Sequence, residues 1–226
     1  MSSWSRTVMA ARQGALFHCK NRYDPARKMY GVVLPGHDVA ELLQWHDDLN
    51  APVAGKGDVV VRVSADGVNN TDISTRTGWY SNSGGAAHDA GWTGEPLTFP
   101  RIEGIDGCGH IAAVGEDVGP ARFGKHILIK PCQREARSET LKSLWYIGSE
   151  CGGGFARFIR AESRHAYTVD SDLTDVELAW LACSYSTAEN VLTRAGVRTG
   201  QNRFDHRRVG RDWFGHRPTG PRGGHV

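Results

Sequence analysis

Short apolar runs with a period of two, each ended by a glycine, are the feature that most restricts how this chain can fold. In residues 58–73 (DVVVRVSADGVNNTDI), Val59, Val61 and Val63 fall on one face of an extended strand, and the residues between them fall on the other. A helix would instead bring a side chain back to the same face about every 3.6 residues. The run therefore predicts a β-strand, and Gly67 is expected to interrupt it.

Comparable runs occur on either side of this segment, in residues 29–36 (MYGVVLPG), 109–118 (GHIAAVGEDV) and 125–131 (KHILIKP). The chain has 28 glycines in 226 residues, well above the average of ~7%, and many of them stand at turn-like positions. Residues 79–98 are rich in Gly, Ser and Trp and predict a long surface loop. Many short strands with glycine turns predict a mainly β fold, either a barrel or a sandwich.

The overall composition excludes several classes of function. The formal net charge is only +2, which gives no reason to expect a nucleic-acid or membrane partner, and no apolar run approaches the ~18 residues that a membrane span needs. The cysteines are odd in number and scattered, as in a reducing cytoplasm rather than in a disulfide framework. They are Cys19, Cys108, Cys132, Cys151 and Cys183. The scattered histidines are expected to lie on solvated surface.

The first 28 residues differ in texture from the rest of the chain. They hold six Lys or Arg and one acid, Asp24, with no sustained helix or strand period, so they predict an unstructured extension. An Arg-bearing, acid-poor opening is also typical of an organellar transit peptide. The other interpretation is that translation naturally starts at Met29.

A helical pattern begins late in the chain. Thr174 is a candidate N-cap, and Glu177 stands at the third position beyond it, as a capping box requires. The pattern is expected to break near residues 184–187 and to stop at Gly196. We therefore divide the folded part into a β domain over residues 29–170 and linking helices over residues 171–200.

Five segments, in this order, resemble the medium-chain dehydrogenase/reductase superfamily, which includes alcohol dehydrogenases and quinone reductases. They are residues 29–36, 57–73, 100–118, 152–160 (GGGFARFIR) and 181–197 (LACSYSTAENVLTRAGV). The resemblance implies a GroES-like β-barrel catalytic domain. In the family, a C-terminal helix then leads into a doubly wound Rossmann domain that binds NAD or NADP.

The resemblance also locates the positions where zinc-dependent members hold their catalytic metal. Here these positions carry Asn69, Ile105 and Cys183, so only one of the three offers a zinc ligand. The structural zinc lobe of the family needs four closely spaced cysteines, but this stretch offers only Cys132 and Cys151. Neither zinc position is therefore expected to be filled, and no zinc is expected in this chain, which is similar to the zinc-free, quinone-reductase-like branch.

Within that branch, the resemblance implies roles for four residues. The Asn69 amide is expected to hydrogen-bond near the nicotinamide, since an amide both donates and accepts. Thr71 matches the position of a proton-relay hydroxyl, and Tyr80 matches a substrate-pocket aromatic. Thr187 matches a position against the nicotinamide, although a threonine in a helix is equally often a backbone-bonded kink. The acids at positions 72 and 106 match positions that are more often structural than catalytic.

After residue 200 the family continues with a buried strand and a glycine turn that receives the cofactor pyrophosphate. This chain reads QNRFDHRRVGRDWFGHRPTGPRGGHV instead, with six arginines and no periodicity, which predicts disorder. Writing residues 201 and 202 as CAA AAC, choosing suitable codons for the rest, and removing one A gives QTVLITGASGGIGSAT. Residues 201–226 are therefore expected to be a frameshifted translation of the cofactor domain. A basic nucleic-acid arm is the alternative interpretation.

These observations predict an NAD(P)H-dependent, zinc-independent oxidoreductase acting on a small carbonyl, enone or quinone. The chain as written is expected to be truncated, inactive and without a bound cofactor. The resemblance implies a small-molecule substrate, a cytoplasmic location and, at full length, a homo-oligomer. The alternative is a non-catalytic GroES-like β domain or a pseudogene product.

Overall fold

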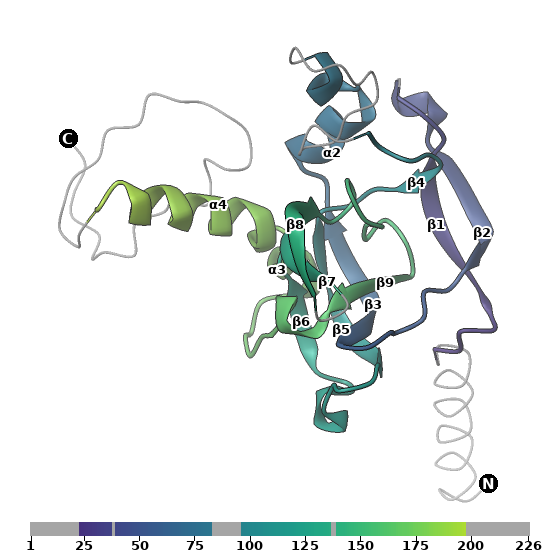
Figure 1. The fold of residues 1–226 in the computed structure, drawn as a ribbon, viewed down its shortest axis with the longest axis vertical. Helices are drawn as coiled ribbons and strands as arrows, with labels where there is room; N and C mark the ends of the chain where they lie inside the picture. The colour runs from purple at the N-terminus through teal and green to yellow at the C-terminus, as the bar shows by residue number, and fades with distance from the viewer. Residues whose placement is uncertain (1–22, 38, 83–95, 137–138, 198–226) are drawn as a thin grey trace, which may run out of the picture.

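A computed structural model describes residues 23–37, 39–82, 96–136 and 139–197. These residues form a mainly β structure whose strands curl into a partly closed barrel (Figure 1), as the alternating runs predict. The strands are β1 Lys28–Leu34, β2 Gln44–Asn50, β3 Asp58–Gly67, β4 Arg101–Ile102, β5 Asp106–Val114, β6 His126–Ile129, β7 Cys132–Ala136, β8 Glu139–Tyr146, β9 Phe158–Glu162 and β10 Ala166–Thr168. Short 3₁₀ turns connect several of them, at Ala40–Leu42, Trp79–Asn82, Pro120–Arg122 and Ser163–His165.

The central sheet has the order β10-β6-β5-β3-β9, and all of its pairs are antiparallel. Strand β3 is its spine, since it pairs with β5 on one side and with β9 on the other. Val59 and Val61 are fully buried on one face of β3, in a cluster with Ile111 and Ile127. Burying side chains of this size contributes ~1.5–3 kcal/mol each. The predicted strand and its end at Gly67 are confirmed.

The other face of β3 is also covered in its first half. Val60 is buried in a second cluster with Met29 of β1 and Phe158 of β9. Strand β1 belongs to a three-stranded sheet of order β2-β1-β4, which lies beside the central sheet (Figure 1). The opening strand predicted at residues 29–36 is confirmed as β1.

Strands β7 and β8 form a separate antiparallel pair, over the stretch that the sequence left without an expected element. Cys132 is the first residue of β7, and Cys151 follows β8. Both have free thiols. A two-stranded β-ribbon therefore stands where the resemblance places a zinc lobe.

The described helices are α2 (Asn70–Arg76), α3 (Asp175–Ala179) and α4 (Leu181–Arg194). The predicted capping box is confirmed: Glu177 N donates to Thr174 Oγ1 at 3.3 Å, and Thr174 N donates to Glu177 Oε2 at 2.8 Å. Gly196 follows the last turn with a φ of 64°, which a glycine adopts without strain.

The expected helix break was placed wrongly. It lies at Trp180, between α3 and α4, and residues 184–187 are inside the continuous α4. Ser186 Oγ donates to the carbonyl of Ala182 at 2.6 Å, so this hydroxyl is satisfied one turn back without ending the helix. Helix α4 then runs outward from the barrel (Figure 1).

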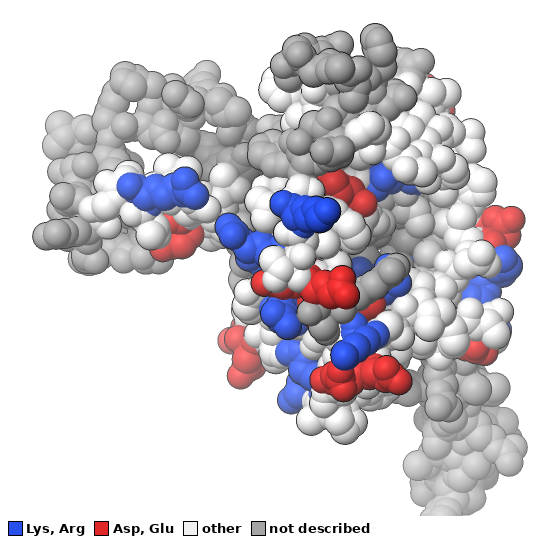
Figure 2. Space-filling view, in the orientation of Figure 1, with Lys and Arg blue, Asp and Glu red and all other residues white. Residues whose placement is uncertain are grey.

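In the part of the chain that the structure describes, no helix has the length and apolar character to cross a membrane. Basic and acidic side chains are interspersed on the face shown in Figure 2. The expectations for residues 1–22, for most of the 79–98 loop and for residues 198–226 fall outside the described residues.

Candidate functional site

Asn69 lies just after β3 and is the N-cap of α2. Its Oδ1 accepts a hydrogen bond from Thr71 N at 3.1 Å, and its own N donates to Asp72 Oδ2 at 2.7 Å. This reciprocal pair is a capping box, which gives hydrogen-bond partners to two backbone N–H groups that have none within the helix. Asn69 is only 3% exposed. The first predicted site residue therefore also holds the start of a helix.

Asp106, the first residue of β5, joins this cap to α4. Its Oδ1 accepts from Cys183 N at 2.7 Å, and its Oδ2 accepts from Asn69 Nδ2 at 3.4 Å. Asp72 makes a similar connection, since its Oδ1 accepts from Gly104 N at 3.2 Å. Both carboxylates are buried and are satisfied by backbone or amide donors, as a structural role requires.

Thr71 and Tyr80 lie together beside the cap. The Tyr80 hydroxyl is hydrogen-bonded to the side chains of Thr71 and Ser74. Burial raises the pKa of Tyr80 above its ordinary value, the two hydrogen bonds lower it, and the charges of Asp72 and Cys183 raise it. The phenol therefore stays protonated at neutral pH, where it can donate a hydrogen bond. Two of the predicted hydroxyls and Cys183 thus share one neighbourhood.

Thr187 is not part of this buried network. It lies on α4, and its side chain is exposed. It stands four residues after Cys183, so the two residues share one face of the helix. Whether Thr187 contacts a nicotinamide stays a prediction.

The residues at the zinc positions do not fit a catalytic zinc ion. Ile105 is 1% exposed and has no donor atom, and the Asn69 amide is engaged with Thr71 N and Asp106. Cys183 alone offers a thiol, whereas a catalytic zinc site uses three protein ligands. We derive no chemical step through a metal at these positions.

Sequence reasoning missed Glu103, which lies between β4 and β5. Its side chain is 2% exposed, and its Oε1 has no hydrogen-bond partner. Burial, followed by the charge of Asp72, raises the pKa of Glu103 to about 8, against the lowering effect of Arg76 and Arg101. The available signal was an acid set between an isoleucine and a glycine, in a stretch of otherwise short apolar runs.

The expectation that the histidines lie on solvated surface is wrong for several of them. His165 is 4% exposed, and its Nε2 lies 2.8 Å from Glu135 Oε2. His110 and His126 are stacked, with ring centroids 4.6 Å apart. Their placement depends on strand pairing, which residue spacing alone did not show.

Comparison with known families gives one match, covering about half of the chain. The family described as the alcohol dehydrogenase GroES-like domain matches residues 55–171. This range contains β3, β5 and the Asn69 cap.

The curated relatives include an alcohol dehydrogenase and a quinone oxidoreductase, the two kinds of enzyme that the sequence motifs resemble. An alcohol dehydrogenase of Moraxella sp. (strain TAE123) is 26% identical over 173 residues, covering 73% of this chain and 47% of the relative. A quinone oxidoreductase of Lama guanicoe is 24% identical over 167 residues, covering 74% of this chain and 41% of the relative. The chain thus spans less than half the length of these relatives.

Solved structures show the same fold. A Sinorhizobium meliloti 1021 protein, provisionally assigned as an alcohol dehydrogenase, has a TM-score of 0.67 and 36% identity, covering 77% of this chain and 49% of that one. An NAD-dependent alcohol dehydrogenase has a TM-score of 0.63 and 26% identity, covering 76% of this chain and 49% of that one.

Proposed function

This chain belongs to the alcohol dehydrogenase GroES-like domain family, within the medium-chain dehydrogenase/reductases, and from that premise we propose that it forms the substrate-side domain of a zinc-independent, nicotinamide-dependent oxidoreductase. The substrate is a small carbonyl, enone or quinone. One observation carries the proposal: the zinc positions hold a helix-capping amide and a buried alkyl group, while the polar Thr71–Tyr80 pair beside them is intact.

The residues have distinct tasks in this proposal. A bound nicotinamide would supply the hydride. Tyr80 donates a hydrogen bond to the substrate oxygen as negative charge develops there, and Thr71, bonded to Tyr80, orients that phenol. Asn69 holds the start of α2 in place and so fixes the position of Thr71. Thr187, on the exposed face of α4, is assigned to the nicotinamide side.

The cofactor and the location are further parts of the proposal. The similarity to an NAD-dependent alcohol dehydrogenase supports a nicotinamide dinucleotide, and the choice between NAD and NADP is left open. The described cysteines are Cys108, Cys132, Cys151 and Cys183, and all are free thiols. Free thiols support a reducing compartment, for which we propose the cytoplasm.

A second candidate is a non-catalytic GroES-like domain that binds a small molecule or nothing. The engagement of the Asn69 amide with Thr71 N and Asp106 favours it, because that amide is already used within the protein. The two candidates differ in whether the Thr71–Tyr80 pair recognises a substrate oxygen.

Protein-observed NMR of the 226-residue chain, titrated with a benzoquinone and with a cyclic enone, separates them. We expect weak, saturable shifts around Tyr80 and Thr71, with a Kd of ~1 mM, because a half-site lacks the enclosure that gives tight binding. Tyr80→Phe and Thr71→Val should weaken these shifts, and Tyr167→Phe, at an exposed tyrosine, should not. Shifts absent at these residues, or unchanged in both site variants, would favour the non-catalytic domain.

A further inference from the structure

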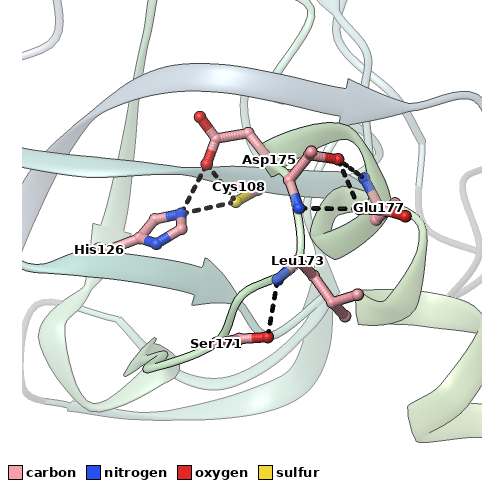
Figure 3. A network of polar contacts seen from close by, with 7 residues as sticks. Cys108, His126, Ser171, Leu173, Asp175 and Glu177 are labelled. Carbon is pink, nitrogen blue, oxygen red and sulfur yellow. Dashed lines mark hydrogen bonds and ion pairs between the residues drawn. The ribbon is translucent and has the colours of Figure 1, made fainter.

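Three metal-binding side chains meet away from the Asn69 cap. Among the side chains that the structure describes, those of Cys108, His126 and Asp175 bring one ligand atom each to within 4.8 Å of the others. His126 Nε2 lies 2.7 Å from Asp175 Oδ1 and 3.5 Å from Cys108 Sγ, and Cys108 Sγ lies 3.8 Å from Asp175 Oδ1. Figure 3 shows the three side chains pointing toward one another.

The fold positions the group from three separate elements. Cys108 lies on β5 and His126 on the neighbouring β6, in the paired part of the two strands. Asp175 is the first residue of α3. Cys108 is fully buried and packs against Leu178, which lies on α3 together with Asp175. The His126 and Asp175 side chains are 24% and 36% exposed, so the group is closed on the thiol side and open to water on the carboxylate side.

We propose that Cys108, His126 and Asp175 bind a zinc ion, with a water molecule as the fourth ligand. A tetrahedral zinc with bonds of ~2.3 Å to sulfur and ~2.0 Å to nitrogen and oxygen keeps its sulfur ~3.5 Å from the other donors, and its nitrogen and oxygen ~3.3 Å apart. The two distances from Cys108 Sγ, 3.5 and 3.8 Å, already match. Only the His126–Asp175 pair, at 2.7 Å, has to open, by ~0.6 Å.

The same geometry argues against a Cys–His–Asp nucleophilic relay. In such a relay the carboxylate and the nucleophile contact opposite nitrogens of the imidazole, whereas here both contact Nε2. Convergence of three donors on one point is what a metal needs.

The proposed site is independent of the zinc positions of the family, which hold Asn69, Ile105 and Cys183. It also serves a different purpose, because its ligands join β5 and β6 to the first turn of α3. Bound zinc fastens the linking helices to the barrel. The expectation of a zinc-free chain rested on the family positions, and this site lies outside them.

The first test is zinc stoichiometry. The purified 226-residue chain is stripped with chelator, dialysed against buffer containing Zn²⁺, and analysed for metal. We expect one equivalent in the wild type. Asp175→Asn and Cys108→Ser should each weaken binding by more than the ~10–100-fold that loss of an outer-shell partner costs. Cys183→Ser and Cys132→Ser are the matched controls and should keep the full equivalent.

Cobalt provides a second measurement, whose wild-type arm does not depend on a variant folding. Co²⁺ added to the wild-type chain should give a thiolate-to-cobalt charge-transfer band. The band should persist in Cys183→Ser and disappear in Asp175→Asn, whose partly exposed position makes it the mildest change. Well under one equivalent of zinc in the wild type, or loss of zinc in Cys183→Ser with retention in Asp175→Asn, would overturn the proposal.

Discussion

At the scale of single residues, the buried carboxyl of Glu103 contributes a pH dependence to the stability of the folded chain. Its pKa is raised to about 8 in the folded domain, against ~4.3 in an unfolded chain. Between these values the folded state holds a proton that the unfolded state has lost, so the free energy of unfolding falls as pH rises, by up to ~1.4 kcal/mol per unit. The contribution of Glu103 is complete below about pH 4.3 and is lost as pH rises through about 8.

Glu103→Gln replaces the titratable carboxyl group with an uncharged amide of the same shape. We expect the variant to gain stability relative to wild type on going from pH 5 to pH 8, by on the order of 3–4 kcal/mol. Urea unfolding at the two pH values measures it. Glu139→Gln, at an exposed carboxyl, serves as the control and should show no such gain. Equal pH slopes for wild type and Glu103→Gln would contradict the raised pKa.

Sequence reasoning reached the site residues unevenly, for a physical reason. Asn69, Thr71 and Tyr80 lie within twelve positions of one another, and a local motif captured them together. Glu103 has a raised pKa because the folded chain buries it and brings the charge of Asp72 close to it, and neither cause shows in its own stretch of sequence. Cys108 and Asp175 are 67 positions apart, so no local spacing could have joined them.

At the scale of elements, the close packing of the 147–157 segment against the turn before β5 depends on glycine. Gly104 has a φ of 104°, and a Cβ there would lie 2.6 Å from Phe155 N. The clash is with backbone, which cannot rotate away. Phe155 N also donates to the Glu103 carbonyl at 2.9 Å, so the close approach is held by a backbone hydrogen bond between the two segments.

We expect Gly104→Ala to lower the free energy of unfolding by at least ~2 kcal/mol, since an unfavourable φ alone costs ~1–3 kcal/mol. Gly119→Ala is the matched control, because Gly119 has a φ of −57° and an added Cβ there would meet nothing within 4 Å. That change should stay within ~0.5 kcal/mol of wild type. Chemical denaturation compares the two. Similar stabilities would show that the loop relaxes around the new methyl group.

The elements that the sequence predicted well are those specified locally. The alternation of β3, its end at Gly67 and the Thr174–Glu177 cap all need only neighbouring residues. The break at Trp180 was predicted at the wrong residues because packing decides where the helix breaks. Leu178 of α3 is buried against the barrel, whereas α4 runs away from the barrel. The β7–β8 ribbon is held by pairing between strands, a contact that the chain's own periodicity does not reveal.

At the scale of the whole molecule, function depends on the reading frame of the gene beyond codon 200. We propose that residues from about 202 are read in a shifted frame, because the alternative frame supplies a strand and a glycine turn. Deleting one base in the run of A at codons 201–202 should extend the open frame with further βα units. The corrected protein should bind NADH or NADPH in calorimetry and reduce quinones or enones, whereas the 226-residue polypeptide should bind neither cofactor at micromolar concentration.

Two outcomes would contradict this prediction. A stop codon soon after the corrected base, or a continuation without alternating strands and helices, would favour the non-catalytic GroES-like domain over the enzyme. Micromolar nicotinamide binding by the 226-residue polypeptide would show that the cofactor needs no such turn. In the corrected protein, Tyr80→Phe should lower turnover more than cofactor affinity, since Tyr80 is assigned to the substrate oxygen.

Helix α4 is attached to the barrel near one end only, within the part of the chain that the structure describes. It has 14 residues and is therefore ~21 Å long, and its first turn is fixed to the barrel by the bond from Cys183 N to Asp106. A tilt of ~10° about that bond would carry the far end through ~3–4 Å but would move Thr187, one turn from the pivot, by only ~1 Å. Such a tilt would thus displace the distal end of the helix by several ångströms and leave Thr187 close to its place beside the barrel.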